Sequence, residues 1–132
     1  MGIANISWYS LDKDMKTCEH PPVDLDRAIE IVEDYYARGN DTFATGEDAL
    51  RATMFGFSRS KTEFIEICVH GPSQIAYKFE LADPDASFLR RMFGGTFQFE
   101  TELRSKSELI ERVKEFFALA PAAIKARLQS EE

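Results

Sequence analysis

Hydrophobic side chains occupy alternate positions in three stretches between residues 62 and 103. The first stretch contains Ile65, Ile67 and Val69, the second Ile75, Tyr77, Phe79 and Leu81, and the third Phe97, Phe99 and Leu103. Successive side chains of a β-strand point to opposite faces of a sheet, so this spacing predicts three strands that share one apolar face. The polar residues between them belong on the opposite face.

Further strands are predicted upstream. Ile6 and Trp8 alternate with polar residues near the start of the chain, and Phe55 and Phe57 are separated by a glycine. Residues 70–73 contain glycine and proline together, which predicts a hairpin between two of the alternating strands. The charged segment from Asp12 to the two prolines at 21 and 22 is expected to form a loop.

Two main helices are predicted, one before and one after the alternating strands. Apolar residues recur at helical spacing after Asp24, a residue that can cap the first turn, and the Gly39-Asn40 pair is expected to stop this helix. Ser105 and Glu108 have the separation of a capping box, and the apolar residues that follow fall on one stripe.

Shorter helices are predicted at 45–52, from residue 83 to the two glycines at 94 and 95, and at 122–128 after Pro121 interrupts the last main helix. A sheet that is apolar on one side needs a second layer. We therefore predict one α+β domain over residues 1–132. It has an antiparallel sheet of four to five strands with two main helices on one face, in the order β-α-β-β-β-α-β-α.

Composition restricts the function. The 16 Lys and Arg residues against 23 Asp and Glu give a formal net charge of -7, which repels a phosphate backbone and disfavours nucleic acid as a partner. The first residues lack a basic region followed by an apolar stretch, and no apolar run is long enough to span a bilayer. We expect a cytoplasmic protein with reduced cysteines, no membrane partner and no cofactor.

Every cysteine and histidine falls in one of two Cys-x-His tripeptides, Cys18-Glu19-His20 and Cys68-Val69-His70. Residues two apart on a strand share a side, so the four side chains are candidate ligands of one tetrahedral zinc ion. Structural zinc sites usually space paired cysteines more widely, so the metal site is the weaker alternative. A thiol nucleophile with a histidine base from the other pair is a second, generic alternative.

The polar face of the alternating strands is the candidate contact surface. It carries Lys78, Glu80, Gln98, Glu100 and Glu102. Clustered carboxylates can act as acid and base, but no other catalytic motif converges with them. We therefore favour a non-catalytic role in which these residues contact another protein, one with a basic surface.

The order of elements from Leu25 to Leu128 is similar to that of two bacterial groups, the small acidic immunity proteins that neutralise toxins and the secretion chaperones. The resemblance implies a domain that neutralises or escorts a partner protein. The alternatives are an enzyme or ligand-binding protein with a pocket between sheet and helices, lined by Trp8, Tyr35, Tyr36 or Tyr77, and a zinc-stabilised domain. A homodimer through an edge strand is also open.

Overall fold

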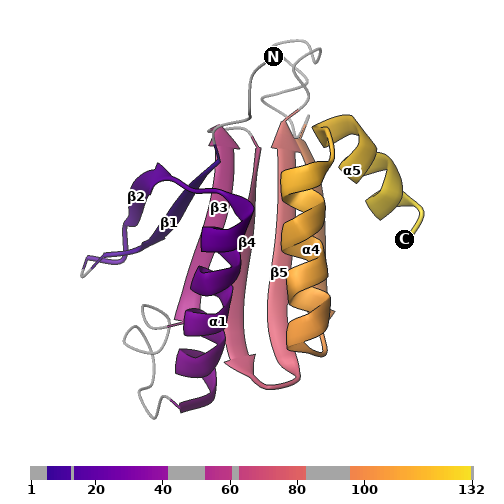
Figure 1. Cartoon of the computed structure of the whole chain (residues 1–132). Helices are drawn as coiled ribbons and strands as arrows, with labels where there is room; N and C mark the ends of the chain where they lie inside the picture. Colours follow the sequence, from indigo (N-terminus) through magenta and orange to yellow (C-terminus); the bar gives the residue numbers. More distant parts are fainter. Residues whose placement is uncertain (1–5, 13, 42–52, 61–62, 83–95, 132) are drawn as a thin grey trace.

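The alternating stretches fold into one antiparallel sheet with helices on one side (Figure 1). The computed structural model of the chain describes residues 6–12, 14–41, 53–60, 63–82 and 96–131. Its strands are β1 (Ser7–Leu11), β2 (Thr17–Pro22), β3 (Met54–Ser60), β4 (Glu63–Gly71), β5 (Gln74–Ala82) and β6 (Thr96–Leu103). They lie in the order β2-β1-β3-β4-β5-β6, and every neighbouring pair is antiparallel.

The described helices are α1 (Leu25–Asp41), α4 (Lys106–Ala118) and α5 (Pro121–Gln129). The predicted caps at both main helices are confirmed. The Asp24 carboxylate accepts a hydrogen bond from the Arg27 N–H at 2.8 Å, and Ser105 Oγ accepts one from the Glu108 N–H at 3.2 Å. These bonds satisfy N–H groups that the first turn of a helix leaves without a partner.

The core lies between the sheet and the helices. α1 and α4 run side by side across the sheet, and α5 lies beside one end of α4 (Figure 1). The predicted inward positions of β4 and β5 are confirmed, since Ile65, Ile67, Ile75 and Phe79 are completely buried. They pack against buried residues of the helices: Ala28, Ile31, Val32, Tyr35, Leu109, Val113, Phe116, Ile124 and Leu128.

The prediction of four to five strands is wrong by one strand, because the segment expected to be a loop contains β2. This strand is the outermost on its side of the sheet, and all but one of its residues are exposed. An edge strand with little burial has no apolar alternation, and its prolines at 21 and 22 are tolerated because one side of the strand needs no N–H donors. The observed order therefore begins β-β-α.

The predicted end of the first helix also needs correction. α1 continues through Gly39 to Asp41. A Cβ at Gly39 would lie 2.4 Å from Val69 Cγ1, so the glycine lets the helix approach β4 closely instead of ending it. The helix expected after Pro121 is present as α5, whereas the predicted helices at 45–52 and after residue 83 lie outside the described residues.

No helix in the described part of the chain is long and apolar enough to cross a membrane.

Candidate functional site

One row of directly paired residues crosses all six strands on the side of the sheet opposite the described helices. It consists of Glu19, Tyr9, Gly56, Glu66, Lys78 and Glu100, from β2 to β6. Residues that pair directly in a sheet share a face. With the alternating residues on either side of this row, they form what we call the open face: Leu11, Met54, Ser58, Phe64, Cys68, His70, Ala76, Glu80, Gln98 and Glu102.

The five residues predicted as contact residues lie together on β5 and β6. Glu80 pairs with Gln98, and Lys78 pairs with Glu100. The Gln98 amide donates to Glu80 Oε1 at 2.6 Å, and Lys78 Nζ lies 3.7 Å from the same oxygen. Glu102 completes the group at the next open-face position of β6. The prediction of a shared polar surface is thus confirmed for these residues, while their role as partner contacts stays a prediction.

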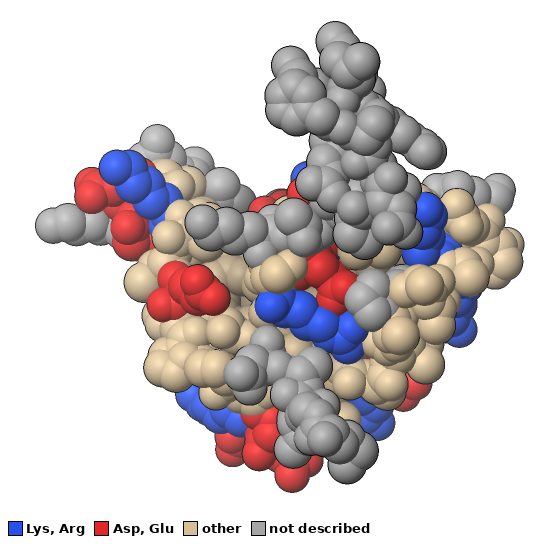
Figure 2. Space-filling view, turned by 90° about the horizontal axis from the view of Figure 1, so that it is seen from above, with Lys and Arg blue, Asp and Glu red and all other residues tan. Residues whose placement is uncertain are grey.

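The sequence interpretation missed Glu66 and Glu19. Glu66 lies directly opposite Lys78 on β4, so Lys78 has a carboxylate on each side, Glu66 and Glu100. The alternation of Ile65, Glu66 and Ile67 already indicates this placement. Among the open-face residues defined above, Lys78 is the one lysine or arginine. The open face therefore concentrates negative charge, whereas acidic and basic side chains lie next to one another at the end of the molecule seen in Figure 2.

Two hollows flank Glu66 on the open face. The first has a volume of about 480 Å³, and the second of about 500 Å³. The first is lined by Glu66, Cys68, His70, Ala76, Tyr77, Lys78, Glu100, Thr101 and Glu102, and the second by Tyr9, Thr17, Glu19, Ser58, Ser60, Phe64 and Glu66. Each hollow combines apolar walls with carboxylates, a composition that suits basic or amphipathic side chains of a partner.

An apolar patch lies between the two hollows, with Tyr9 and Phe64 lining the second hollow and Cys68 lining the first. Tyr9, Met54 and Cys68 pack together there, with Leu11 and Phe64 at the side. The patch is anchored by the Tyr9 hydroxyl, which donates to the Ile65 carbonyl at 2.7 Å. Burial raises the pKa of the Tyr9 phenol far above its ordinary value, so the hydroxyl stays a donor.

Gly56 makes room for the Tyr9 ring. A Cβ on Gly56 would lie 2.2 Å from Tyr9 Cζ and 2.3 Å from the Ile65 carbonyl oxygen. No other residue type fits at this position without movement of the neighbouring strands. The aromatic ring covers the glycine backbone across the β1–β3 pair, an arrangement that stabilises strand pairs containing glycine.

The structure does not bring the two Cys-x-His pairs together. Cys18 pairs with Ser10, on the same side as Trp8, which packs against the helix-covered core. Cys68 and His70 lie on the open face of β4, and β1 and β3 separate β2 from β4. Three spacings of ~4.8 Å between adjacent strands separate β2 from β4, so the two Cys-x-His pairs lie about 14 Å apart across the strands. They also lie on opposite faces of the sheet. One tetrahedral site from all four residues does not form in this arrangement.

His20 has structural contacts instead. Its ring stacks on Trp8 with centroids 3.9 Å apart, and its Nε2 lies 2.8 Å from Ser10 Oγ. These contacts hold β2 against β1. Within the described residues, no group of three or more Cys, His, Asp or Glu side chains is arranged to hold a metal ion.

The thiol chemistry considered from the sequence also lacks its geometry. Cys68 is buried, and burial raises the pKa of its thiol despite a contact at 3.5 Å with the Thr53 hydroxyl. A protonated buried thiol is a poor nucleophile. Cys18 is exposed but lies on the opposite side of the sheet from His70.

No family model matches this chain, and neither the curated proteins nor the solved structures contain a match to it.

Proposed function

We propose that this chain is a non-catalytic domain that binds another protein and inhibits or escorts it, with the open face as the contact surface. The observation that carries the proposal is the placement of Glu66, Glu80, Glu100 and Glu102 on neighbouring strands around Lys78. A cluster of one charge sign speeds encounter with a partner of opposite sign and disfavours other partners. The partner surface we expect is basic.

The degree of exposure favours binding over chemistry. The Glu102 side chain is 49% exposed, and Glu100 is exposed as well. General acids and bases with shifted pKa values are usually at least partly withdrawn from water. Carboxylates that lie at the surface are available to Lys and Arg side chains of a partner.

The packing of the interior supports the same choice. The aromatic residues that would line a ligand pocket between sheet and helices contact one another or the core. Tyr77 is 2% exposed, Tyr35 stacks on Phe55 with centroids 4.6 Å apart, and Trp8 stacks on His20. These side chains fill space between the layers, which favours the binding domain over an enzyme with a pocket there.

The most concrete form of the proposal is an immunity protein or inhibitor, with a secretion chaperone as the second form. For either form we propose a cytoplasmic location. Two free thiols, one exposed and one buried, are compatible with a reducing compartment. The two forms differ in the partner they bind: an inhibitor binds a folded, active partner, whereas a chaperone binds a partner that has not yet folded.

The test begins with the protein that co-purifies with this chain from its native cell. The dissociation constant of the complex is measured for the wild type, for Glu100→Lys/Glu102→Lys and for Glu30→Lys. Glu30 is 69% exposed on α1 and serves as the control for charge reversal away from the open face. We expect the double variant to bind at least about tenfold more weakly, since like charges at an interface cost several kcal/mol. Equal affinities for all three proteins would refute the proposal.

A second measurement separates the two forms. An inhibitor abolishes the activity of a folded partner when mixed with it in equal amount. A chaperone instead releases an active partner and binds it best before it has folded. If a purified mixture shows neither inhibition nor release of an active partner, that result counts against the whole functional assignment.

A further inference from the structure

β6 leaves a regular edge on one side of the sheet. It is 8 residues long and pairs with β5 from Thr96 to Leu103 without a register shift. In the described part of the chain no strand pairs with its other side. The opposite edge is different, because β2 ends in two prolines and its pairing with β1 is irregular. A regular edge without proline or bulge presents N–H and C=O groups to which an added strand can bond.

Carboxylates lie on both sides of this edge. Glu100 and Glu102 of β6 lie on the open face. On the helix side, Glu108 and Glu111 of α4 border the last residues of β6. Glu111 is 73% exposed and lies 3.9 Å from Lys114 Nζ, and Glu102 lies 3.9 Å from Arg104 Nη2, so each of these two carboxylates has one exposed cation beside it. A chain that lies along β6 therefore meets carboxylates on both of its faces, and those of Glu100 and Glu102 stand next to each other on the open face.

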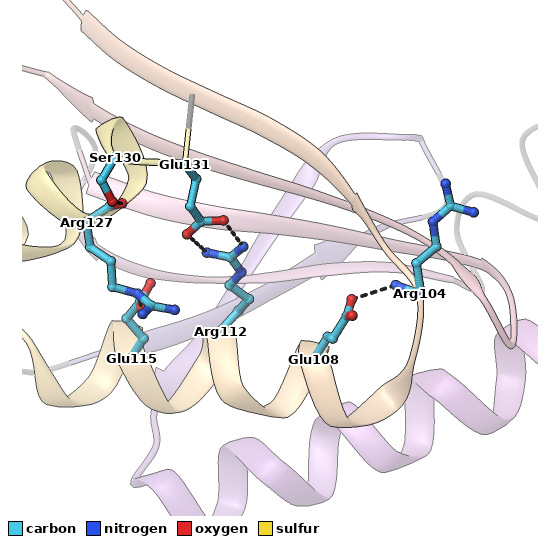
Figure 3. Close-up of polar contacts among 7 residues, drawn as sticks. All are labelled: Arg104, Glu108, Arg112, Glu115, Arg127, Ser130 and Glu131. Atoms are coloured by element: carbon cyan, nitrogen blue, oxygen red, sulfur yellow. Dashed lines mark hydrogen bonds and ion pairs between the residues drawn. The ribbon is translucent and has the colours of Figure 1, made fainter.

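A hollow of about 400 Å³ continues the edge on the helix side. It lies between Leu103 of β6 and Ser107 and Glu111 of α4. Its two arginines already have acidic partners within the chain, as Figure 3 shows. Arg112 donates two hydrogen bonds to Glu131, at 2.9 and 2.6 Å, and Arg127 pairs with Glu115. The paired arginines offset little of the negative charge that a partner meets.

We propose that β6 accepts an extended segment of the partner protein as an added strand, and that this segment carries Lys or Arg at alternate positions. The inference rests on the proposed function and specifies how the partner docks. Alternate side chains of the added strand lie on the open face beside Glu100 and Glu102. The side chains between them point toward the hollow on the helix side, where Leu103 is the apolar residue of the lining against which a small apolar side chain can pack.

A second copy of this chain fits the edge less well. Antiparallel pairing of two β6 strands over nearly their whole length allows two registers that keep the faces continuous. One register places Glu100 directly opposite Glu100 of the copy. The other pairs Gln98 with Glu100 of the copy, so that the two Glu100 side chains are diagonal neighbours on the same face. Like charges at such positions destabilise strand pairing, so the occupant we infer is a basic segment of a different protein.

The test uses a capped peptide of alternating Lys and Val, with a peptide of alternating Glu and Val as the matched control. Amide hydrogen exchange of the full-length chain is followed by NMR at each residue with and without peptide. In an edge strand every second amide points away from the sheet and exchanges readily. We expect the Lys-Val peptide to slow these outward amides between Phe97 and Leu103. We expect no slowing by the Glu-Val peptide.

Charge reversal gives the second readout. Glu100→Lys/Glu102→Lys should weaken Lys-Val peptide binding by at least about tenfold, whereas Glu30→Lys should leave it unchanged. Equal slowing by both peptides, or no slowing in β6 by either, overturns the inference. If the double variant does not fold, the comparison of the two peptides on the wild type still decides.

The co-purified partner distinguishes failure of this inference from failure of the proposed function. A partner whose affinity depends on Glu66 and Glu100, but which leaves the outward β6 amides in fast exchange, overturns strand addition alone. A partner indifferent to charge reversal anywhere on the open face removes the proposed function. The Lys-Val peptide should also compete with the partner, and simultaneous binding of both would contradict the inferred docking site.

Discussion

Replacing Arg59 with methionine should destabilise the protein by an amount that depends on pH. Arg59 of β3 is 15% exposed and lies 3.1 Å from the Glu63 carboxylate, whose side chain is 6% exposed. The same guanidinium donates to the carbonyls of Phe116 and Leu119 at the end of α4, the second at 3.0 Å. Methionine keeps most of the apolar stem while removing the charge and the donors.

The magnitude has two parts. Removing one member of a buried ion pair costs ~3–5 kcal/mol, because the other member stays buried and charged. For Arg59→Met this figure includes the hydrogen bonds that the guanidinium loses. Of this, the two bonds to helix carbonyls contribute about 1 kcal/mol each and do not depend on pH. We therefore expect a loss of about 4 kcal/mol at pH 7, of which about 2 kcal/mol depends on the charge of Glu63.

The sign of the pH dependence follows from Glu63. Burial raises the pKa of this carboxyl in the folded protein, although Arg59 lowers it in part. The folded protein then holds the proton more tightly than the unfolded chain, so the cost of the charged form is present above the folded-state pKa. This cost disappears as the pH falls through that pKa. Without Arg59 the pKa rises further, and the pH-dependent part of the loss vanishes as the pH approaches the ordinary glutamate value.

The assay is urea denaturation of the wild type, Arg59→Met and Arg59→Met/Glu63→Gln at pH 7 and at pH 4.5, with the slope m checked for constancy. The loss in Arg59→Met should fall from about 4 to about 2 kcal/mol on acidification. In the double variant it should not change with pH. A loss of the same size at both pH values in Arg59→Met would show that the Glu63 charge is not the source.

Two further predictions concern the open face. Gly56→Ala should destabilise the protein by about 3 kcal/mol or more, because the new methyl overlaps Tyr9 and the Ile65 carbonyl. Gly71→Ala is the control and should be nearly neutral, since a Cβ at Gly71 would lie 3.8 Å from its nearest neighbouring atom. Similar midpoints of thermal unfolding for the two variants would contradict the close packing of Tyr9 on Gly56. Tyr9→Phe should cost about 1 kcal/mol in urea unfolding through loss of one buried hydrogen bond, and an unchanged free energy of unfolding would mean that water replaces it.

Much of the fold was predictable because local patterns coincide with burial. The odd-numbered residues of β4 and β5 face the core as their alternation predicts, and the caps at Asp24 and Ser105 begin the two main helices. β2 could not be predicted in the same way. Its residues are mostly exposed, so its pairing with β1 has no hydrophobic pattern that a sequence would record.

The candidate site was predictable only within each strand. Alternation assigns Lys78 and Glu100 to the polar side of β5 and β6, but the pairing register decides that they lie opposite each other and that Glu66 joins them. Register also places Cys18 and Cys68 on opposite sides of the sheet. Such relations depend on several successive strand pairings, so a one-residue slip would reverse them.

The most direct test of the open face as the contact surface is an NMR footprint of the isotope-labelled chain in complex with its co-purified partner. We predict the largest shift changes at residues of the open face, with Glu66, Lys78 and Glu100 at their centre. Shift changes concentrated on the exposed side of α1, around Glu30 and Asp34, with the open face unchanged, would contradict the proposal.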